Sequence, residues 1–386
     1  MVAKTHGNRA GGMGEFDLMK KTLRPGEPVS RPPKPRSEEE IFSQWKSDPN
    51  NPLVTILCIT YDHEPYIEDA LNSFLAQDTD FPFEIWVHDD ASTDGTREII
   101  ERYQAAYPRI VKAVLQKENK YSQGYQPLRF LRDVCRGKYC ALCEGDDYWV
   151  SAQKLTRQVA AMERNPASGL SIHPAYQINV TSNRTISMFD KGNAEAVLDV
   201  AEAVASANQY SPTASYFFRT KEFQSMPRWF FEARDLPFGD YFIESIMGRN
   251  GLVYLPDLYS VYRRNTPGSF TERTSRTTDE KLVARMQAVL SYTDKLKEYP
   301  EIPRFAIQHR RSNVFLDYQN MAITRNSFEM FQMVQEISKN IGETLPHSRE
   351  LAGTNKITFV IFVKMRRVIL LIKNLAYRYR IVHFEK

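Results

Sequence analysis

Continuous apolar segments alternate with amphipathic ones in the chain that follows Pro52. The apolar runs are typical of strands buried on both faces, and they occupy residues 53–61, 83–90, 110–116 and 138–147. Between them, apolar residues recur near helical spacing at residues 65–77, 96–107 and 128–135. Strands and helices that alternate in this order predict an α/β fold, in which helices cover a mainly parallel sheet.

The second half of the chain continues this pattern less regularly. Further strands are expected at residues 169–179 and 211–219, with a loop-rich segment between them at 181–208. Further helices are expected at residues 151–166, 236–251 and 277–345. The last of these helical regions shows no evident chemistry. We therefore expect a single sheet domain followed by a helical C-terminal extension.

The N-terminal segment differs from the rest in composition. Residues 22–37 are rich in Pro and basic residues and can bury little surface, so we expect residues 1–50 to be a flexible leader with a short helix at 38–45. The first 21 residues lack the apolar core of a secretory signal peptide. Nothing here predicts export.

The net charge and the cysteine content exclude few classes of function. The formal net charge of +4 is too small to indicate a nucleic-acid partner. Four cysteines suit a reducing compartment, because a secreted chain of this length that relied on disulfides would carry more. Cys140 and Cys143 have CxxC spacing, but no second pair completes a zinc site, so buried structural thiols are expected.

Acidic residues gather where the predicted strands end. Tyr61 and Asp62 follow the first strand, and further carboxylates follow the second and fourth strands at Asp89, Asp90, Glu144, Asp146 and Asp147. Open parallel sheets bind ligands beyond the carboxyl ends of their strands. A divalent cation, Mg²⁺ or Mn²⁺, would hold such hard oxygen ligands together and grip a diphosphate. The alternative is a solvated turn, since Gly and Asp are common turn residues.

Three stretches together resemble the family 2 glycosyltransferases of the GT-A fold. They are VTILCITYDHEPYIEDALNSFLAQ, EIWVHDDASTDGT and GKYCALCEGDDYW, in the order and spacing of that family. The resemblance runs from about residue 52 to about residue 270. It implies a glycosyltransferase domain at 51–272. The amphipathic and charge patterns that follow predict a helical extension at 273–350 and a basic amphipathic C-terminal helix at 351–386.

The resemblance assigns the donor nucleotide to the ends of the first two strands. It implies that Tyr61 lies near the nucleobase, where packing at the strand end is the alternative, and that Asp89 accepts from a uracil N3 proton with Asp90 beside it. Ser92 and Asp94 also fit the start of the following helix, and for Asp94 the residues favour that capping role.

The resemblance also assigns the metal. EGDD corresponds to the family's DxD signature, so Glu144 and Asp146 take its two acidic places and Asp147 extends it. Glu144 departs from the usual Asp, which leaves Asp146 as the expected ligand of Mn²⁺ or Mg²⁺, with Asp147 close behind. The metal would neutralise the charge that develops on the leaving nucleoside diphosphate.

The catalytic base implied by the resemblance is Asp240. The family commonly has a Glu before this Asp, whereas this chain has Gly239, and an Asp at a helix start also suits the helix dipole. Arg263 and Arg264 fall in a segment that resembles the one closing over the phosphates, with a solvated basic turn as the alternative. The QxxRW signature of processive synthases is absent from the sequence.

The C-terminal segment is basic and amphipathic. Residues 356–386 hold eight Lys or Arg and one Glu, and apolar positions from Ile357 to Tyr379 share one side of a helical wheel. This pattern is typical of a helix lying in an anionic membrane surface, and a helix packed on protein is the alternative. Interspersed cations argue against a membrane span.

The resulting hypothesis is an inverting, metal-dependent transferase. It would move a sugar from a nucleotide-diphosphate sugar, expected to be a UDP-sugar, to a hydroxyl of a glycan or lipid-linked acceptor in cell-surface glycan assembly. We expect a cytoplasmic protein, peripheral on the inner membrane face, without a nucleic-acid partner. A catalytically idle carbohydrate- or nucleotide-binding scaffold and a nucleotidyltransferase are the alternatives.

Overall fold

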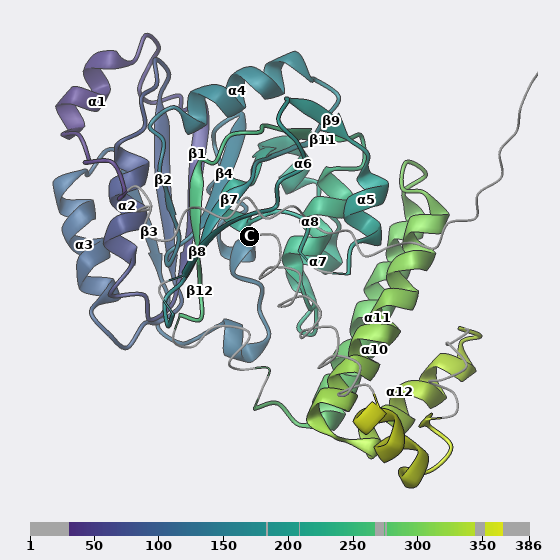
Figure 1. The fold of residues 1–386 in the computed structure, drawn as a ribbon. Coiled ribbons are helices and arrows are strands. Elements are labelled where there is room, and N and C mark those ends of the chain that lie inside the picture. The colour runs from purple at the N-terminus through teal and green to yellow at the C-terminus, as the bar shows by residue number, and fades with distance from the viewer. Residues whose placement is uncertain are drawn as a thin grey trace, which may run out of the picture.

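Figure 1 shows the computed structural model, which describes residues 31–365 except 183, 208, 267–273, 275 and 344–351. A large mixed sheet lies at its centre with helices on both faces, and long helices of the C-terminal region stand beside it. In sheet order the strands are β3 (Val111–Leu115), β2 (Phe83–Asp89), β1 (Val54–Thr60), β4 (Tyr139–Glu144), β10 (Phe217–Arg219), β6 (Leu170–Ile172), β11 (Leu252–Tyr254) and β9 (Ala196–Leu198). The predicted α/β fold is confirmed.

The first four strands form a parallel block, as their apolar runs predict. Side chains of a strand point alternately to opposite faces, so Ile56 of β1 enters one core and its neighbour Leu57 enters the other. One core lies under α2 (Ile67–Leu75), α3 (Thr96–Ala106) and α4 (Lys154–Arg164). Both faces of β1 are therefore buried, which explains why its sequence is continuously apolar.

The opposite core contains the shorter helices. These are α5 (Val200–Ala205), α6 (Thr220–Gln224), α7 (Arg228–Glu232) and α8 (Gly239–Met247). Short 3-10 turns are η1 (Tyr121–Gln123), η2 (Pro127–Phe130), η3 (Thr213–Ser215) and η4 (Leu296–Glu298). The helix predicted at 128–135 is wrong, because this segment contains only η2 and then turns. It returns to β1 at Gly137, where a Cβ would lie 2.7 Å from the Thr55 amide nitrogen.

The strand predicted at 169–179 is in fact two strands in different sheets. β6 ends at Ile172, and β7 (Ala175–Asn179) belongs to a second sheet with the order β5 (Tyr148–Trp149), β12 (Ser260–Arg264), β7 and β8 (Arg184–Met188). The break falls at Pro174, which has no N–H to continue the hydrogen-bond ladder. The loop-rich expectation for 181–208 is also wrong, since β8, β9 and α5 lie there.

The helical extension begins at α10 (Asp279–Lys295), continues through α11 (Arg304–Arg325) and reaches α12 (Phe328–Asn340). The three helices share a core of their own, which Figure 1 shows away from the large sheet. The start of α11 does not belong to that core. Ala306 and Ile307 join the core under the large sheet, so the extension is anchored in the sheet domain.

Both ends of the described chain are packed on the protein. α1 (Glu38–Gln44) begins with a capping box between Ser37 and Glu40, and its Ile41 is buried against the sheet domain. At the other end, residues 356–365 are helical and bury Phe359 and Val363 in the core of the extension. Residues 1–30 of the predicted leader and 366–386 of the predicted basic helix lie outside the described residues.

Candidate functional site

The ends of three parallel strands are level with one another. Thr60 of β1 pairs with Asp89 of β2, and Ile59 pairs with Glu144 of β4. The residues that follow these strands therefore meet at one edge of the sheet, where parallel sheets bind ligands. The predicted convergence of the first, second and fourth strand ends is present in the structure.

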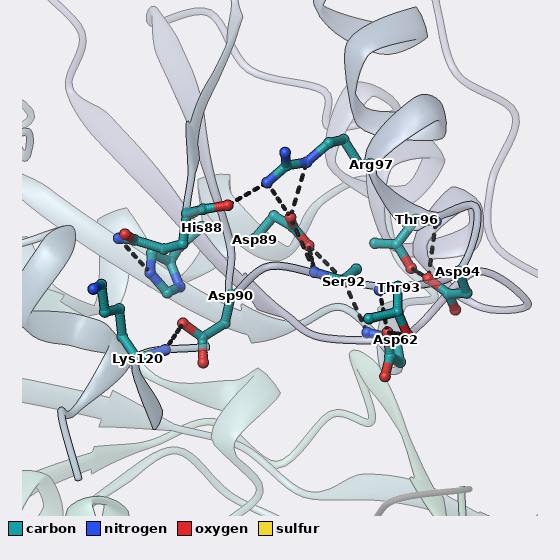
Figure 2. Close-up of polar contacts among 11 residues, drawn as sticks. Asp62, His88, Asp89, Asp90, Ser92, Thr93, Asp94, Thr96, Arg97 and Lys120 are labelled. Atoms are coloured by element: carbon teal, nitrogen blue, oxygen red, sulfur yellow. Dashed lines mark hydrogen bonds and ion pairs between the residues drawn. The ribbon is translucent and has the colours of Figure 1, made fainter. Parts of the chain in front are cut away.

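The loops after β1 and β2 are joined by hydrogen bonds (Figure 2). Asp62 has a φ of 52°, a left-handed conformation that Asp tolerates, and its carboxylate accepts from the backbone N–H of Thr93 at 2.7 Å. The Ser92 hydroxyl accepts from the Asp62 N–H at 2.9 Å. Asp94 accepts from the N–H of Thr96 at 3.0 Å, which fixes the start of α3. These bonds connect the loop after β1 to the loop after β2 and to the start of α3.

Asp89 and Asp90 are both buried but differ in their partners. Both oxygens of Asp89 accept bonds, from Ser92 and from the Arg97 guanidinium at 3.2 Å. Within the described part of the chain, Asp90 accepts only from the backbone N–H groups of residues 120 and 121, at 2.8 and 2.9 Å. A carboxylate can accept about four bonds. Recognition of a base by Asp89 stays a prediction, and Asp90 is the neighbour with more acceptor capacity.

Tyr61 and the acidic cluster complete the edge. Tyr61 is exposed at the end of β1, where a ring can stack on a flat partner. Glu144, Asp146 and Asp147 each place a carboxylate oxygen within 4.8 Å of the others. Asp147 is fully buried, and its Oδ2 has no hydrogen-bond partner among the described residues. Burial, and then the charge of Asp146, raises the pKa of Asp147 well above its ordinary value.

This arrangement fits a divalent cation. Three carboxylates at such close range repel one another, and a hard cation with oxygen ligands removes that repulsion. The unpartnered Oδ2 of Asp147 is a buried ligand atom that the described protein leaves unsatisfied. Asp146 is held beside it, because the Thr266 hydroxyl donates to its Oδ2 at 3.0 Å.

The two arginines predicted to clamp a diphosphate lie in different surroundings. Arg263 donates to the backbone carbonyl of Asp146 at 2.8 Å and pairs with Asp69. Its own N–H donates to Asp147 at 2.8 Å, so Arg263 fixes the loop that carries the cluster. Arg264 is exposed at the end of β12. Phosphate binding by either residue stays a prediction.

Asp240 is the second residue of α8, and the buried carboxylate of Glu244 holds that helix in place. Glu244 lies one turn later and accepts from Ser211, through both its N–H and its hydroxyl at 2.8 Å, and from the Tyr216 hydroxyl at 2.8 Å. The Tyr216 carbonyl in turn accepts from Leu142 of β4 at 2.9 Å. Through these bonds α8 is held beside the segment that precedes β10, which in turn contacts β4.

Asp240 itself is half-buried, and burial raises its pKa. A raised value suits a base, since general-base catalysis is most effective when the pKa lies near the working pH. Burial, and then the charge of Asp240, also raises the pKa of Glu244 to about 7.

Glu244 gives a prediction for stability. Its pKa rises from an ordinary 4.5 to about 7 in the fold. Between these values the unfolded chain has released a proton that the folded chain keeps. The free energy of unfolding should therefore fall as the pH rises through this window, by about 3 kcal/mol in all. Glu244→Gln cannot ionise, so urea denaturation across the window should give a flatter curve for the variant.

The slope of that curve carries the test. The amide of Gln replaces one acceptor oxygen by a donor, which lowers the free energy of unfolding by the same amount at every pH. This loss therefore cannot by itself change the slope. Glu232→Gln, at an exposed carboxylate on α7, is the control and should keep the wild-type slope. If the free energy of unfolding changed with pH in the same way for Glu244→Gln and the wild type, Glu244 would have the same pKa in the folded and the unfolded chain, which would contradict the prediction.

Several residues of this edge were missed in the sequence. Arg97 and Thr266 support Asp89 and Asp146, but neither stands in a pattern that distinguishes it from a surface residue. Glu244 carried a usable signal, because it lies one helical turn after Asp240 on a predicted amphipathic helix.

Comparisons with known proteins agree with this geometry. The model of the family described as Glycosyl transferase family 2 matches residues 55–227. Uncharacterized protein Rv1520 of Mycobacterium tuberculosis is 30% identical over 249 residues, which is 61% of this chain and 68% of that protein. A glucosyltransferase of Escherichia coli, WfaP, named as acting from UDP-Glc on α-D-GlcNAc-diphosphoundecaprenol, is 32% identical over 112 residues, 29% of this chain and 41% of WfaP.

A solved structure has the same fold. The crystal structure of S. aureus TarS 1-349 in complex with UDP-GlcNAc superposes with a TM-score of 0.55, at 17% sequence identity, over 73% of this chain and 81% of that one. The residues matched by the family model include the acidic cluster and the strand ends of the parallel block. This chain belongs to glycosyl transferase family 2, and it is a glycosyltransferase with a GT-A fold.

Proposed function

We propose that this glycosyltransferase is metal-dependent and inverting, and that it moves a sugar from a UDP-sugar to a hydroxyl of a glycan or lipid-linked acceptor in cell-surface glycan assembly. The observation that carries the proposal is the acidic cluster of Glu144, Asp146 and Asp147, which follows β4 at the carboxyl edge of the parallel block. Three carboxylates at such close range suit a divalent cation.

Asp146 and Asp147 would hold Mn²⁺ or Mg²⁺, with Glu144 beside them. When bound, a divalent ion supplies Lewis-acid stabilisation of the charge on the leaving diphosphate. The chain's own residues prepare this position, since Thr266 orients Asp146 and the Arg263 backbone orients Asp147. Arg264 lies exposed at the end of the same strand, which supports a role in pairing with phosphate oxygens.

The UDP moiety would lie between the ends of β1 and β2. Tyr61 offers a ring face to the base, and Asp89 or Asp90 offers an acceptor to the N3 proton of uracil. Two relatives support this donor, because the TarS structure holds UDP-GlcNAc and WfaP is named for transfer from UDP-Glc. The WfaP name also supports a lipid-diphosphate acceptor.

Asp240 would act as the base in a single displacement. The acceptor oxygen attacks C1 of the sugar as its proton passes to the Asp240 carboxylate. The bond from C1 to the phosphate oxygen breaks, and UDP leaves from the opposite side, so the anomeric centre is inverted. Glu244 holds α8 in position for this step through Ser211 and Tyr216.

Donor screening tests the proposal directly. The wild-type protein is incubated with a panel of sugar nucleotides and glycan acceptors with Mn²⁺, and nucleoside diphosphate release is followed. UDP release that needs both the acceptor and the metal is expected. Pyrophosphate release would indicate a nucleotidyltransferase, and tight nucleotide binding with no release from any donor would indicate an idle scaffold.

The C-terminal region supports a location at a membrane surface. In the helix at 356–365, Phe359 and Val363 face the protein, while Ile357, Ile361 and Met365 are 73%, 51% and 60% exposed. These three residues recur every four positions and form one apolar stripe. The sequence around the stripe is strongly basic, which complements anionic lipid headgroups. None of the described helices is long and apolar enough to cross a membrane.

We therefore predict binding to anionic vesicles through this stripe, in keeping with a peripheral protein of the cytoplasmic membrane face. Replacing Ile357, Ile361 and Met365 together by Gln should weaken co-sedimentation with phosphatidylserine-containing vesicles by at least about tenfold, because three apolar side chains no longer enter the lipid. The substitutions leave Phe359 and Val363 in the core, so the fold is kept.

A matched control separates the stripe from general apolar exposure. Phe305 is 69% exposed at the start of α11, and Phe305→Gln should leave vesicle binding unchanged. Equal sedimentation of the triple variant and the wild type would rule out the stripe as the membrane contact.

A further inference from the structure

A buried arginine connects the helical extension to the sheet domain. Arg310 of α11 is 5% exposed, and its Nη1 donates to the carbonyls of Ser206 and Ala207 at 2.8 and 2.7 Å. These carbonyls directly follow the C-terminal end of α5. The last carbonyls of a helix have no hydrogen-bond partner within the helix. Asn313, one turn further along α11, donates to the Ala205 carbonyl at 3.0 Å. Two side chains of the extension thus cap the end of α5.

The C-terminal end of α5 also contacts α8. The Tyr241 hydroxyl donates to the Val204 carbonyl at 3.1 Å, and Tyr241 is the residue that follows Asp240. Arg310 also lies over the Tyr241 ring, with its Cζ 4.6 Å from the ring centroid. α8, α5 and the helical extension therefore meet at one buried point. There Arg310 of the extension contacts both α5 and α8.

The charge of Arg310 has no close counter-ion in the part of the chain that the structure describes. Among the described residues no carboxylate lies within ion-pair distance of its guanidinium, and a buried cation without one is costly. Backbone carbonyls and the face of a tyrosine ring compensate part of that cost. The described groups that interact electrostatically with Asp240 are Glu244 on its own helix, Tyr216 before β10 and Arg310 from α11. Arg310 is the only cation among these three.

We propose that Arg310 is a positioning residue for the transfer reaction: it holds the Asp240 helix against α5, and its positive charge favours the carboxylate of Asp240 over the neutral acid. The inference rests on the proposed function, because it takes Asp240 to be the base. Burial raises the pKa of Asp240, and the backbone N–H groups of Asp240 and Tyr241, followed by the charge of Arg310, oppose that rise. The extension would thus be part of the catalytic unit.

Arg310→Met tests the proposal, since Met keeps an apolar stem of similar length and removes the charge. The pH profile of kcat/KM for sugar transfer is measured with saturating Mn²⁺. Without the cation Asp240 should ionise at a higher pH, so the loss should be severalfold near pH 6 and smaller near pH 8.5. Arg310→Lys keeps the charge and should recover most of the activity near pH 6.

The neighbouring residue provides the matched control. Arg311 is equally buried, but it pairs with Asp294 and Glu343 within the extension. Arg311→Met should lower the melting temperature without changing the shape of the pH profile. If Arg310→Met loses activity equally at every pH, or if Arg310→Lys fails as fully as Arg310→Met, the charge has no role and the proposal is overturned.

A titration independent of turnover separates this proposal from the proposed function. The Asp240 carboxyl signal is identified in ¹³C-Asp-labelled protein by its absence in Asp240→Asn, and is followed with pH. A higher pKa in Arg310→Met than in the wild type is expected, and an unchanged value would refute the electrostatic role even if no donor is turned over. Absence of transfer by the wild-type protein would instead count against the proposed function.

Discussion

Asp240→Asn should abolish sugar transfer while UDP binding in the presence of Mn²⁺ stays close to that of the wild type. The substitution keeps the shape of the side chain but removes the proton acceptor, and loss of a general base costs about 10²- to 10⁴-fold in rate. Asp240 lies at the start of α8 and is not one of the residues after β1 and β2 that are expected to bind the nucleotide, so the nucleotide contacts should survive. Turnover is measured by UDP release and binding by calorimetry.

A nearby carboxylate provides the control for this variant. Asp235 is exposed and bonds to the Tyr292 hydroxyl at 2.6 Å, and Asp235→Asn should keep wild-type turnover. Turnover of Asp240→Asn within a few-fold of the wild type would exclude Asp240 as the base. Loss of UDP binding in the same variant would show that the helix had moved, and would call for the pH profile instead.

Asp146→Ala should lose the metal dependence of UDP binding. Calorimetry of the wild type with UDP should give tighter binding with Mn²⁺ than with EDTA, and the variant should bind weakly in both. Supporting residues around metal sites typically contribute 10- to 100-fold in metal affinity, so loss of a ligand should weaken Mn²⁺-dependent binding by at least about 100-fold.

The control for Asp146→Ala is an aspartate without a place in the site. Asp133 has a side chain that is 90% exposed, and Asp133→Ala should keep the Mn²⁺ effect on UDP binding. If Asp146→Ala retains the full Mn²⁺ effect, the ion is bound elsewhere or is not needed for the donor.

The strand ends of the parallel block could be predicted from the sequence because each buried strand is a continuous apolar run. β1, β2 and β4 are buried on both faces, so their ends are marked by the first polar residues, and those residues are the candidate ligands. The register Ile59 to Glu144 then follows from packing three such strands side by side. A local signal was sufficient for this part of the site.

Other parts depend on contacts between distant segments. The break at Pro174 separates two strands of one apolar run, and the partners in two different sheets decide where each half belongs. In the sequence, Arg310 resembles any other cation on an amphipathic helix. The periodicity of α11 does not reveal that this helix caps α5, which lies about a hundred residues earlier in the chain. The same holds for Thr266, which contacts Asp146 from the segment after β12.

The roles of Asp89 and Arg263 also depend on such contacts. The sequence presents Asp89 as a free carboxylate, but the fold pairs it with Arg97, and it presents Arg263 as a free cation, but the fold pairs it with Asp69. A charged side chain at a strand end can pair with several groups of opposite charge, and the tertiary structure determines which of these pairs forms. Asp90 and Arg264 keep more capacity for a ligand.

The most direct measurement is the position of manganese in crystals grown with UDP and Mn²⁺, located by anomalous scattering at the manganese edge. A single peak touching the Asp146 carboxylate and the UDP diphosphate, with Asp147 or Glu144 beside it, is the predicted result. UDP bound at the ends of β1 and β2 with no anomalous peak against any of these three carboxylates would contradict the metal-dependent account.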